Sequence, residues 1–455
     1  MAVVVEEMCV QTTRGCKTLV VGLGKTGLSS ARYLTRRGAE VAVTDTRVAP
    51  PELETARQEL PEMPLFLGGF SESAFARAEQ IVVSPGVSRK HPLIEAAGTR
   101  GVEVVGDVEL FARAALAPVI AVTGSNGKST VTTWVGEMAR AAGRITRVGG
   151  NLGTPVLEIL QDEEPDLYVL ELSSFQLETT WSLAPAAAAV LNLSPDHLDR
   201  YASVAEYAAA KQRIFRHAAV QVVNADDRLA SSLVDAGRPV RRFTLAEPGG
   251  EEYGIAEHAG SEWLMRGAHP VLPVNALCIP GRHNVANALA ALALGDAAGL
   301  PEAAMLRALR SFQGLPHRMQ WVAEFNEVTW YNDSKGTNPG ATCAAASGLR
   351  QPLVLLAGGD GKGADFSPLR DALAGKARAV ILFGRDAPLI ESALNGVVPV
   401  RHAASLQEAV RLASRTAQPG DAVLLSPACA SFDMFSGYEQ RGQVFMDAVR
   451  GLANG

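Results

Sequence analysis

The segment best suited to chemistry is a glycine-rich loop that follows an apolar run. Residues 119–123 read Val-Ile-Ala-Val-Thr, which is typical of a buried strand, and residues 124–130 read Gly-Ser-Asn-Gly-Lys-Ser-Thr. A helix is expected over 131–142. A strand, a glycine loop and a helix in this order form a phosphate site, because backbone N–H groups and the helix N-terminus point at the anion.

The side chains of this loop fit a nucleoside triphosphate with its metal. Lys128 can reach the terminal phosphates, and the hydroxyl of Ser129 or Thr130 can ligate Mg²⁺. The usual spacing, G-x-x-x-x-G-K-[S/T], would put its first glycine at Val122, so the match is to a shorter variant of the P-loop.

Two more predicted strands, over 166–170 and 188–192, end in polar side chains. Glu171 ends the first, which is where a second Mg²⁺ ligand beside a P-loop belongs. The other leads to Asp196 and His197. A lone histidine is more often structural than a ligand, but its expected place in the same sheet as Glu171 favours a ligand.

A second glycine-rich loop lies near the N-terminus. A strand over 18–21 runs into Gly-Leu-Gly-Lys-Thr-Gly at 22–27, a helix is expected over 28–37, and a strand over 41–44 ends at Asp45. This is the dinucleotide fingerprint, with its acid about 20 residues past the loop. Alone it indicates a NAD-dependent oxidoreductase, but a uridine diphosphate would suit the same loop.

A strand predicted over 80–83 leads to Ser84, Pro85 and Gly86. These residues are either a further ligand loop, since ligands bind at the carboxyl ends of such strands, or an ordinary turn. Both interpretations stay open at this point.

Length and composition limit the class of protein. The chain has 455 residues, enough for two to three domains, and its 47% hydrophobic and 20% charged residues are typical of a soluble globular protein. A net charge of −6 argues against a general nucleic-acid binder. No leader is evident in residues 1–17, and no apolar run approaches the ~20 residues of a membrane span. The sequence spacing of the cysteines suggests no metal or disulfide motif, so reduced thiols are expected at Cys9, Cys16, Cys278, Cys343 and Cys429.

The last third of the chain predicts another layer of strands and helices. Strands are expected over 352–357, 379–383 and 421–425, each followed by a loop rich in glycine or serine. These loops should gather at one edge of a sheet. Lys335 and Lys362 there can bind carboxylates, although either lysine alone would be an ordinary solvated charge. With Thr337 and Ser431 they make a plausible dicarboxylate pocket.

Several of these segments carry a family resemblance. Residues 123–130, 171–177 and 192–199 resemble the corresponding motifs of the Mur ligases and folylpolyglutamate synthetases, which form amide bonds with ATP. Residues 281–288, 314–318, 358–363 and 425–431 are similar to further segments of the Mur ligases. Residues 331–338 resemble the N-D-S-K-A-T-N segment of the D-glutamate-adding members, with Gly336 where alanine is usual and, further on, Tyr438 where phenylalanine is usual. The resemblance covers essentially the whole chain.

The resemblance implies an α/β fold of three domains. A Rossmann-like N-terminal domain over 1–112 would bind the UDP substrate, and a P-loop ATPase-like central domain over 113–315 would bind ATP and two Mg²⁺ ions. A Rossmann-like C-terminal domain over 316–455 would bind the amino acid. The implied reaction joins UDP-N-acetylmuramoyl-L-alanine to D-glutamate through an acyl phosphate, in peptidoglycan precursor synthesis in the bacterial cytoplasm. A monomer is expected.

The resemblance also assigns roles to residues. The residues implied for ATP are Gly124, Ser125, Asn126, Gly127, Lys128, Ser129, Thr130, Asn284, Asn287, Arg318 and Asp333. Those implied for the UDP substrate are Gly24, Lys25, Thr26, Asp45, Thr46, Ser84, Gly86, Asn151 and Ser173. D-Glutamate is assigned to Lys335, Thr337, Lys362, Ser431 and Tyr438. The catalytic set is Lys128, Glu171, His197 and Lys211, and the metal ligands are Ser129, Glu171, His197 and Lys211.

Lys211 is the position on which spacing and resemblance disagree. It lies on a helix expected after residues 201–203, where a lysine is usually solvated. In the ligases that the chain resembles, the lysine of this segment is carbamylated by CO₂. A protonated lysine has only hydrogen-bond donors and cannot ligate Mg²⁺, whereas a carbamate can.

Two other function classes remain from the sequence alone. The first is a NAD-dependent dehydrogenase, which would use the N-terminal loop but would leave the P-loop and Lys335 without a role. The second is a non-catalytic nucleotide switch, which would bind ATP without phosphate release that depends on an amino acid.

Overall fold

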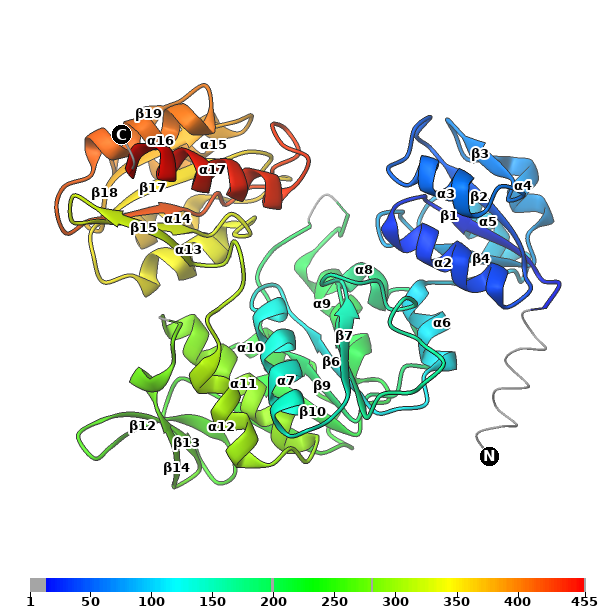
Figure 1. Cartoon of the computed structure of the whole chain (residues 1–455), viewed down its shortest axis with the longest axis horizontal. Coiled ribbons are helices and arrows are strands. Elements are labelled where there is room, and N and C mark those ends of the chain that lie inside the picture. Colours follow the sequence, from blue (N-terminus) through cyan, green and yellow to red (C-terminus); the bar gives the residue numbers. More distant parts are fainter. Residues whose placement is uncertain (1–13, 198–199, 280, 454–455) are drawn as a thin grey trace.

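The computed structural model describes residues 14–197, 200–279 and 281–453. Cys9 and the residues Leu198 and Asp199 of the predicted 192–199 motif lie outside the described residues, as does most of the segment examined for a leader. Figure 1 shows three units along the chain, coloured blue, cyan to green, and yellow to red. Each contains one sheet with helices packed on it.

The N-terminal unit is a parallel sheet in the order β3-β2-β1-β4-β5. Its strands are β1 Lys17–Val21, β2 Glu40–Asp45, β3 Leu65–Leu67, β4 Gln80–Val83 and β5 Glu103–Val105. Its helices are α2 Lys25–Arg36, α3 Leu53–Glu59, α4 Glu72–Arg77, α5 Pro92–Thr99 and α6 Asp107–Ala114. The strand order reverses between β1 and β4, so the loops after these two strands meet at the switch point where ligands bind in such sheets.

The central unit contains a nine-stranded sheet in the order β14-β13-β12-β11-β10-β9-β6-β8-β7. Its strands are β6 Val119–Thr123, β7 Thr146–Gly150, β8 Leu167–Glu171, β9 Ala187–Val190, β10 Val220–Asn224, β11 Val240–Phe243, β12 Tyr253–His258, β13 Ser261–Arg266 and β14 His269–Pro273. From β7 at one edge of the sheet through β8, β6, β9, β10 and β11 to β12, all neighbouring strands pair in parallel. The last two pairs, β12–β13 and β13–β14, are antiparallel. The antiparallel extension is not predicted by the sequence analysis.

Helices cover this sheet and build its core. They are α7 Lys128–Ala141, α8 Ser174–Leu177, α9 Val204–Gln212, α10 Arg228–Ser232, α11 Arg282–Ala297 and α12 Glu302–Ser311, with short 3₁₀ turns at Arg213–Phe215 and Val274–Ala276. Fully buried Trp134 on α7 packs on Phe312 just after α12, with ring centroids 4.8 Å apart. This aromatic contact fixes the helix that begins at the P-loop.

The C-terminal unit is a six-stranded sheet in the order β15-β16-β20-β17-β18-β19. Its strands are β15 Gln320–Phe325, β16 Val328–Asn332, β17 Leu353–Gly358, β18 Ala377–Phe383, β19 Val400–His402 and β20 Ala422–Leu425. Its helices are α13 Pro339–Gly348, α14 Ser367–Leu373, α15 Ala387–Leu394, α16 Leu406–Thr416 and α17 Tyr438–Ala453. All strand pairs are parallel except the β15–β16 hairpin. The α/β fold class is therefore confirmed.

The N-terminal and central units share part of one apolar core. Phe111 on α6 meets Tyr168 on β8 edge to face, with ring centroids 5.0 Å apart. Helix α6 spans residue 112, the domain boundary expected from the sequence, and its side chains pack in a core that both units share. The domain boundaries themselves stay predictions.

The connection from β1 into α2 depends on Gly27, in the first turn of the helix, which cannot be enlarged. A Cβ on Gly27 would lie 1.9 Å from the carbonyl oxygen of Gly22, whereas a Cβ on Gly24 would meet nothing within 4 Å. We expect Gly27→Ala to lower the free energy of unfolding by about 1–3 kcal/mol, as overpacking does, and Gly24→Ala to cost less than about 1 kcal/mol. Calorimetric thermal unfolding of both variants measures this, and equal losses would contradict the prediction.

Candidate active site

The P-loop lies at the carboxyl edge of the central sheet. Strand β6 is flanked by β8 and β9, and all three run parallel, so the loop after β6 lies beside Glu171 and beside the segment after β9. Gly127 caps α7 with a φ of 81°, in the left-handed region that favours glycine. A Cβ there would lie 2.3 Å from Oδ1 of Asn287 on α11. The loop is therefore closely packed against the helix that carries Asn284 and Asn287.

Two lysines donate to the same carbonyl oxygen under this loop. Nζ of Lys128 lies 2.9 Å from the carbonyl oxygens of Gly124 and Ser125. Nζ of Lys211 lies 2.9 Å from the Gly124 oxygen and 3.3 Å from Oγ1 of Thr123. The carbonyl of Gly124 thus holds two amines at a site where an anion is expected.

Lys211 is only 1% exposed, so the surface position suggested by its helical spacing is wrong. Its Nζ lies 4.7 Å from the centroid of the Tyr207 ring, one turn earlier on α9, and the Tyr207 hydroxyl is 3.2 Å from Oγ of Ser125. Burial and the nearby charge of Lys128 lower the pKa of Lys211 well below its usual value. These surroundings disfavour the charged form of the amine.

Glu171 is buried at the end of β8 and holds one oxygen without a hydrogen-bond partner. Its Oε1 accepts from Nδ2 of Asn151 at 2.6 Å, while Oε2 is buried without a partner. Burial alone would raise the pKa of Glu171, but the positive charges of Lys128, Arg318 and Lys335 hold it below its usual value. The carboxylate is thus ionised and has a free oxygen, as a metal ligand requires.

Ser129 follows β6 and His197 follows β9, two strands that run parallel to β8 in the central sheet. Ser129 opens α7 and accepts at Oγ from Nη2 of Arg318 at 2.7 Å. His197 follows β9 with a φ of 56°, and its ring meets Phe175 edge-on with centroids 4.8 Å apart. Throughout the described part of the chain, no three or more His, Cys, Asp and Glu side chains are grouped as a metal site. A metal here would need hydroxyl or modified ligands besides Glu171.

A cavity of about 670 Å³ lies between the central and C-terminal units. Its walls include residues predicted to bind ATP from both units: Asn126, Gly127, Thr130, Asn284, Asn287, Arg318 and Asp333. Burial raises the pKa of Asp333 to about 6, although the Ser426 hydroxyl donates to its Oδ2 at 2.7 Å. Lys335, predicted to bind the amino acid, also lines this cavity.

The residues predicted to bind D-glutamate follow adjacent strands. Lys335 and Thr337 follow β16, Ser431 follows β20, and Lys362 follows β17. Nζ of Lys335 donates to the Tyr438 hydroxyl at 3.0 Å. Burial and the charge of Arg318 lower the pKa of Lys335 to about 8.

Contacts from the C-terminal unit also reach the segment before His197. Nζ of Lys362 lies 3.4 Å from Oδ1 of Asp196, and Nδ2 of Asn338 donates to Oδ2 of Asp196 and to Oδ1 of Asn126, at 3.3 Å each. Lys362 is therefore paired with the central unit in this structure.

The N-terminal loop is held by hydrogen bonds at its switch point. Oδ2 of Asp45 accepts from the backbone N–H of Leu23 at 2.7 Å, and the hydroxyl of Ser84 donates to the carbonyl of Gly22 at 2.9 Å. The segment forms a turn, closed by a hydrogen bond from the Val87 N–H to the Ser84 carbonyl at 2.9 Å, and it lies beside the first glycine loop. Ligand binding by residues 84–86 stays a prediction. Among the remaining residues predicted for the UDP substrate, Lys25, Thr46 and Gly86 are exposed, Thr26 is half-buried, and Ser173 caps α8.

Several arginines that position this site have no signal in motif spacing. Arg47 pairs with Asp45 through Nη2 at 2.7 Å. Fully buried Arg441 donates to Oγ and the carbonyl of Ser334 and to the carbonyls of Cys429 and Ala430, which joins the loops after β16 and β20. Asp45 lies only two residues before Arg47, whereas Ser334 is distant in sequence from Arg441, so only the fold brings the contacts of Arg441 together.

The chain contains no helix, within the residues described, that is long and apolar enough to cross a membrane. The described cysteines Cys16, Cys278, Cys343 and Cys429 are free thiols.

Comparison with protein families gives three consecutive matches along the chain. Residues 16–106 match a Mur ligase MurD-like N-terminal domain, residues 122–295 a Mur ligase middle domain, and residues 317–429 a Mur ligase glutamate ligase domain. Together the three matches cover most of the chain, and each falls on one of the three sheets.

Curated relatives extend the likeness over nearly the full length. The chain is 57% identical over 435 residues to a UDP-N-acetylmuramoylalanine–D-glutamate ligase of Nitrosococcus oceani, covering 95% of this chain and 96% of that one. It is 55% identical over 441 residues to a ligase of the same name from Methylobacillus flagellatus, covering 96% and 97%.

Among solved structures, the fold is similar to a UDP-N-acetylmuramate–alanine ligase of Thermotoga maritima, with a TM-score of 0.62 and 20% identity over 96% of this chain and 99% of that one. A pseudomurein peptide ligase of Methanothermus fervidus gives a TM-score of 0.59 and 18% identity over 96% and 99%. These two likenesses support the fold.

Proposed function

The chain belongs to the Mur ligase family, and from this premise we propose that it joins D-glutamate to UDP-N-acetylmuramoyl-L-alanine, converting ATP to ADP and phosphate. Relatives that share more than half of its residues carry the name of this ligase. The structural observation that carries the proposal is the cavity bounded by both the P-loop and Lys335. A nucleotide on the P-loop would lie next to the cation expected to hold the amino acid.

The reaction has two steps. A carboxylate oxygen of the UDP substrate attacks the γ-phosphorus of ATP, so that an acyl phosphate forms and ADP leaves. The amine of D-glutamate then attacks the acyl carbon, the amide bond forms, phosphate leaves with the electron pair of the broken C–O bond, and the amine loses a proton. Most of the rate comes from positioning and from offsetting negative charge.

The P-loop residues act on the nucleotide. The phosphates would be enclosed by the loop residues Gly124, Ser125, Asn126 and Gly127. Lys128, which here donates to the carbonyls of Gly124 and Ser125, would bind the phosphates instead. Asn284, Asn287, Arg318 and Asp333 would hold the rest of the nucleotide, because they line the same cavity. Thr130 lies on the loop side of this cavity.

The N-terminal loop would hold the UDP substrate. Open space beside Gly24 suits the close approach of a diphosphate, and Ser84 ties the second loop to the first. Lys25, Thr26, Asp45, Thr46 and Gly86 belong to the same edge of the sheet, and Asn151 and Ser173 would reach the substrate from the central unit.

Mg²⁺ fits the donor set in this region. The free Oε2 of Glu171 and the hydroxyl of Ser129 would hold one ion, and His197 with a modified Lys211 would hold the second. Bound Mg²⁺ would offset the repulsion between a carboxylate and a triphosphate.

Lys211 is proposed to carry a carbamate. Its amine is buried and its pKa lies well below the usual value, so the neutral form can attack CO₂. A bond forms between Nζ and carbon, the nitrogen loses a proton, and the product is an anion. This replaces a second ammonium beside Lys128 with a negative group that can ligate metal.

D-Glutamate would lie against Lys335, with Thr337, Lys362, Ser431 and Tyr438 around it. The proposal also places the enzyme in the bacterial cytoplasm, where ATP is available. A monomer suffices, because one chain supplies residues for all three substrates.

The function is tested by ADP and phosphate release from purified protein with ATP, UDP-N-acetylmuramoyl-L-alanine and a panel of D- and L-amino acids. We expect release that depends on D-glutamate and falls by about 10³-fold or more in Lys128→Ala, which loses the phosphate-facing charge. ATP binding without amino-acid-dependent release would indicate the nucleotide switch instead, and a nicotinamide absorbance change would indicate the dehydrogenase.

The carbamate is tested by replacing its lysine. We expect Lys211→Ala to lose about 100-fold or more in activity, as metal-site changes do, and to regain part of it with formate or acetate. Wild-type protein in ¹³C-bicarbonate should show one carbamate signal by NMR that is absent in Lys211→Ala and present in Lys128→Ala. Normal turnover by Lys211→Ala would refute the assignment.

The lowered pKa of Lys335 predicts how D-glutamate binding depends on pH. Lys335 is charged below pH 8 and loses its charge as the pH rises through about 8, so KM for D-glutamate should increase above that pH, approaching about tenfold per unit. Lys335→Arg keeps its charge and should lack this increase. Because D-glutamate itself titrates equally in both assays, the same increase in both proteins would count against Lys335.

A further inference from the structure

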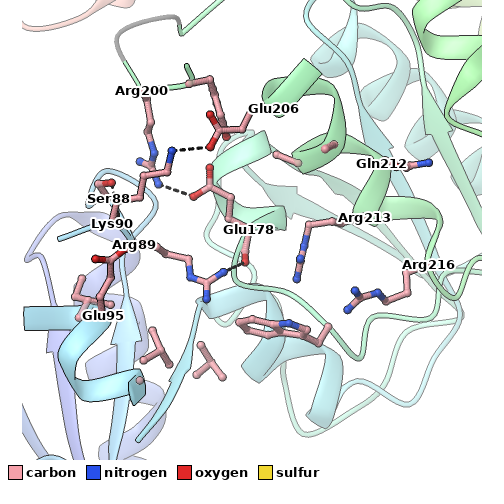
Figure 2. A pocket seen from close by; sticks show the side chains of 18 of the residues that line it. Ser88, Arg89, Lys90, Glu95, Glu178, Arg200, Glu206, Gln212, Arg213 and Arg216 are labelled. Carbon is pink, nitrogen blue, oxygen red and sulfur yellow. Dashed lines mark hydrogen bonds and ion pairs between the residues drawn. The ribbon is translucent and has the colours of Figure 1, made fainter. Parts of the chain in front are cut away.

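Arg200 crosses the border between the N-terminal and central units. Its guanidinium donates from Nη1 to the carbonyl of Pro85 at 2.6 Å and from Nη2 to the carbonyl of Val87 at 3.2 Å. The same Nη2 donates to Oε2 of Glu178, which follows α8, at 2.9 Å. Figure 2 shows Arg200 directed toward Glu178.

The side chain of Arg200 is only 13% exposed. Its guanidinium carbon lies 4.0 Å from the centroid of the Phe175 ring, which packs over it as a cation–π partner. Phe175 in turn meets the His197 ring at 4.8 Å. Arg200 therefore touches the aromatic side chain that supports His197.

On its other side, Arg200 holds the loop expected to bind the UDP substrate. Pro85 and Val87 flank Gly86 in that loop, and Ser84 connects it to Gly22 of the first glycine loop. One side chain thus joins the loop of the UDP substrate to the segment that carries His197.

A planar guanidinium suits this position and an ammonium does not. The fork of N–H donors reaches two carbonyls and a carboxylate at fixed angles while its face stacks on an aromatic ring. A lysine would keep the charge but could not satisfy these partners in the same geometry.

A second ion pair crosses the same border but differs in its surroundings. Nζ of Lys90 pairs with Oε1 of Glu206 at 2.6 Å, and the side chains are 61% and 36% exposed. Figure 2 shows this pair beside the Arg200–Glu178 pair. Exposed pairs contribute little, because water screens them, so Lys90 provides a matched control for a cross-border contact without a link to His197.

We propose that Arg200 is a positioning residue, which fixes the UDP-substrate loop relative to His197 and so sets where the acceptor carboxylate meets ATP. This inference rests on the proposed ligase function. The cavity proposed for ATP does not include the residues of this contact, which are Arg200, Glu178, Pro85 and Val87. Loss of Arg200 should therefore affect the UDP substrate and not the nucleotide.

The test compares Arg200→Lys with Lys90→Ala in steady-state kinetics, and measures binding of UDP-N-acetylmuramoyl-L-alanine without ATP by calorimetry. We expect Arg200→Lys to lower kcat/KM for the UDP substrate by about 10- to 100-fold, the range for a misplaced reactant, and to leave KM for ATP within about twofold. Lys90→Ala should leave both parameters within about twofold.

Glu178→Gln gives a second measurement should Arg200→Lys fail to fold. It removes one charge and leaves the two loop carbonyls paired, so we expect about a threefold loss in kcat/KM for the UDP substrate. No loss for the UDP substrate in either variant, an equal change in KM for ATP, or an equal effect of Lys90→Ala would overturn the proposal. Wild-type protein without D-glutamate-dependent ADP release would instead refute the ligase function itself.

Discussion

The site depends on one carbonyl group that holds two amines. The oxygen of Gly124 accepts from Lys128 and from Lys211, both at 2.9 Å. Gly124 has a φ of 152°, and a Cβ there would lie 3.1 Å from Cβ of Leu191, so the chain needs glycine to turn this carbonyl toward the lysines. Two ammonium groups this close repel each other. An anionic ligand near Lys128, or the proposed carbamate on Lys211, would remove that repulsion, which supports placing the nucleotide and the carbamate in one site.

The parallel sheets explain how distant segments reach this carbonyl. Strands β8, β6 and β9 run side by side, so Glu171, the P-loop and the His197 segment emerge at one edge. Arginines then connect the central unit to its two neighbours. Arg318 reaches Ser129 from one unit, and the carbonyls of Pro85 and Val87 are held from the other border by Arg200. Buried charged contacts of this kind fix geometry more than they add stability.

The sequence predicted the parts of the structure that follow from local pattern. The strands at 119–123 and 80–83 have the expected bounds, because short β-branched runs ending in glycine or serine loops leave few alternatives. Helix α2 begins at Lys25, earlier than expected, because a glycine loop does not mark the first helical residue. The burial of Lys211 and the contacts of Arg200 and Arg441 were not predictable, since their partners are distant in sequence. Arg47 pairs with Asp45 only two residues away, but it belongs to no motif that would mark it. The antiparallel strands β12 to β14 lack a glycine motif that would mark them.

The N-terminal fingerprint shows why a motif must be interpreted through its contacts. In a dinucleotide site, the acid at the position of Asp45 would bind the ribose. Here Asp45 is 2% exposed, accepts from the Leu23 N–H, and is paired through both oxygens with Arg47. Its carboxylate is already committed to holding the loop and an exposed arginine at the strand end. A carboxylate committed in this way is less available to the ribose of a nicotinamide cofactor, and the Arg47 charge beside it would favour a diphosphate, which supports the proposal that this loop binds the UDP substrate.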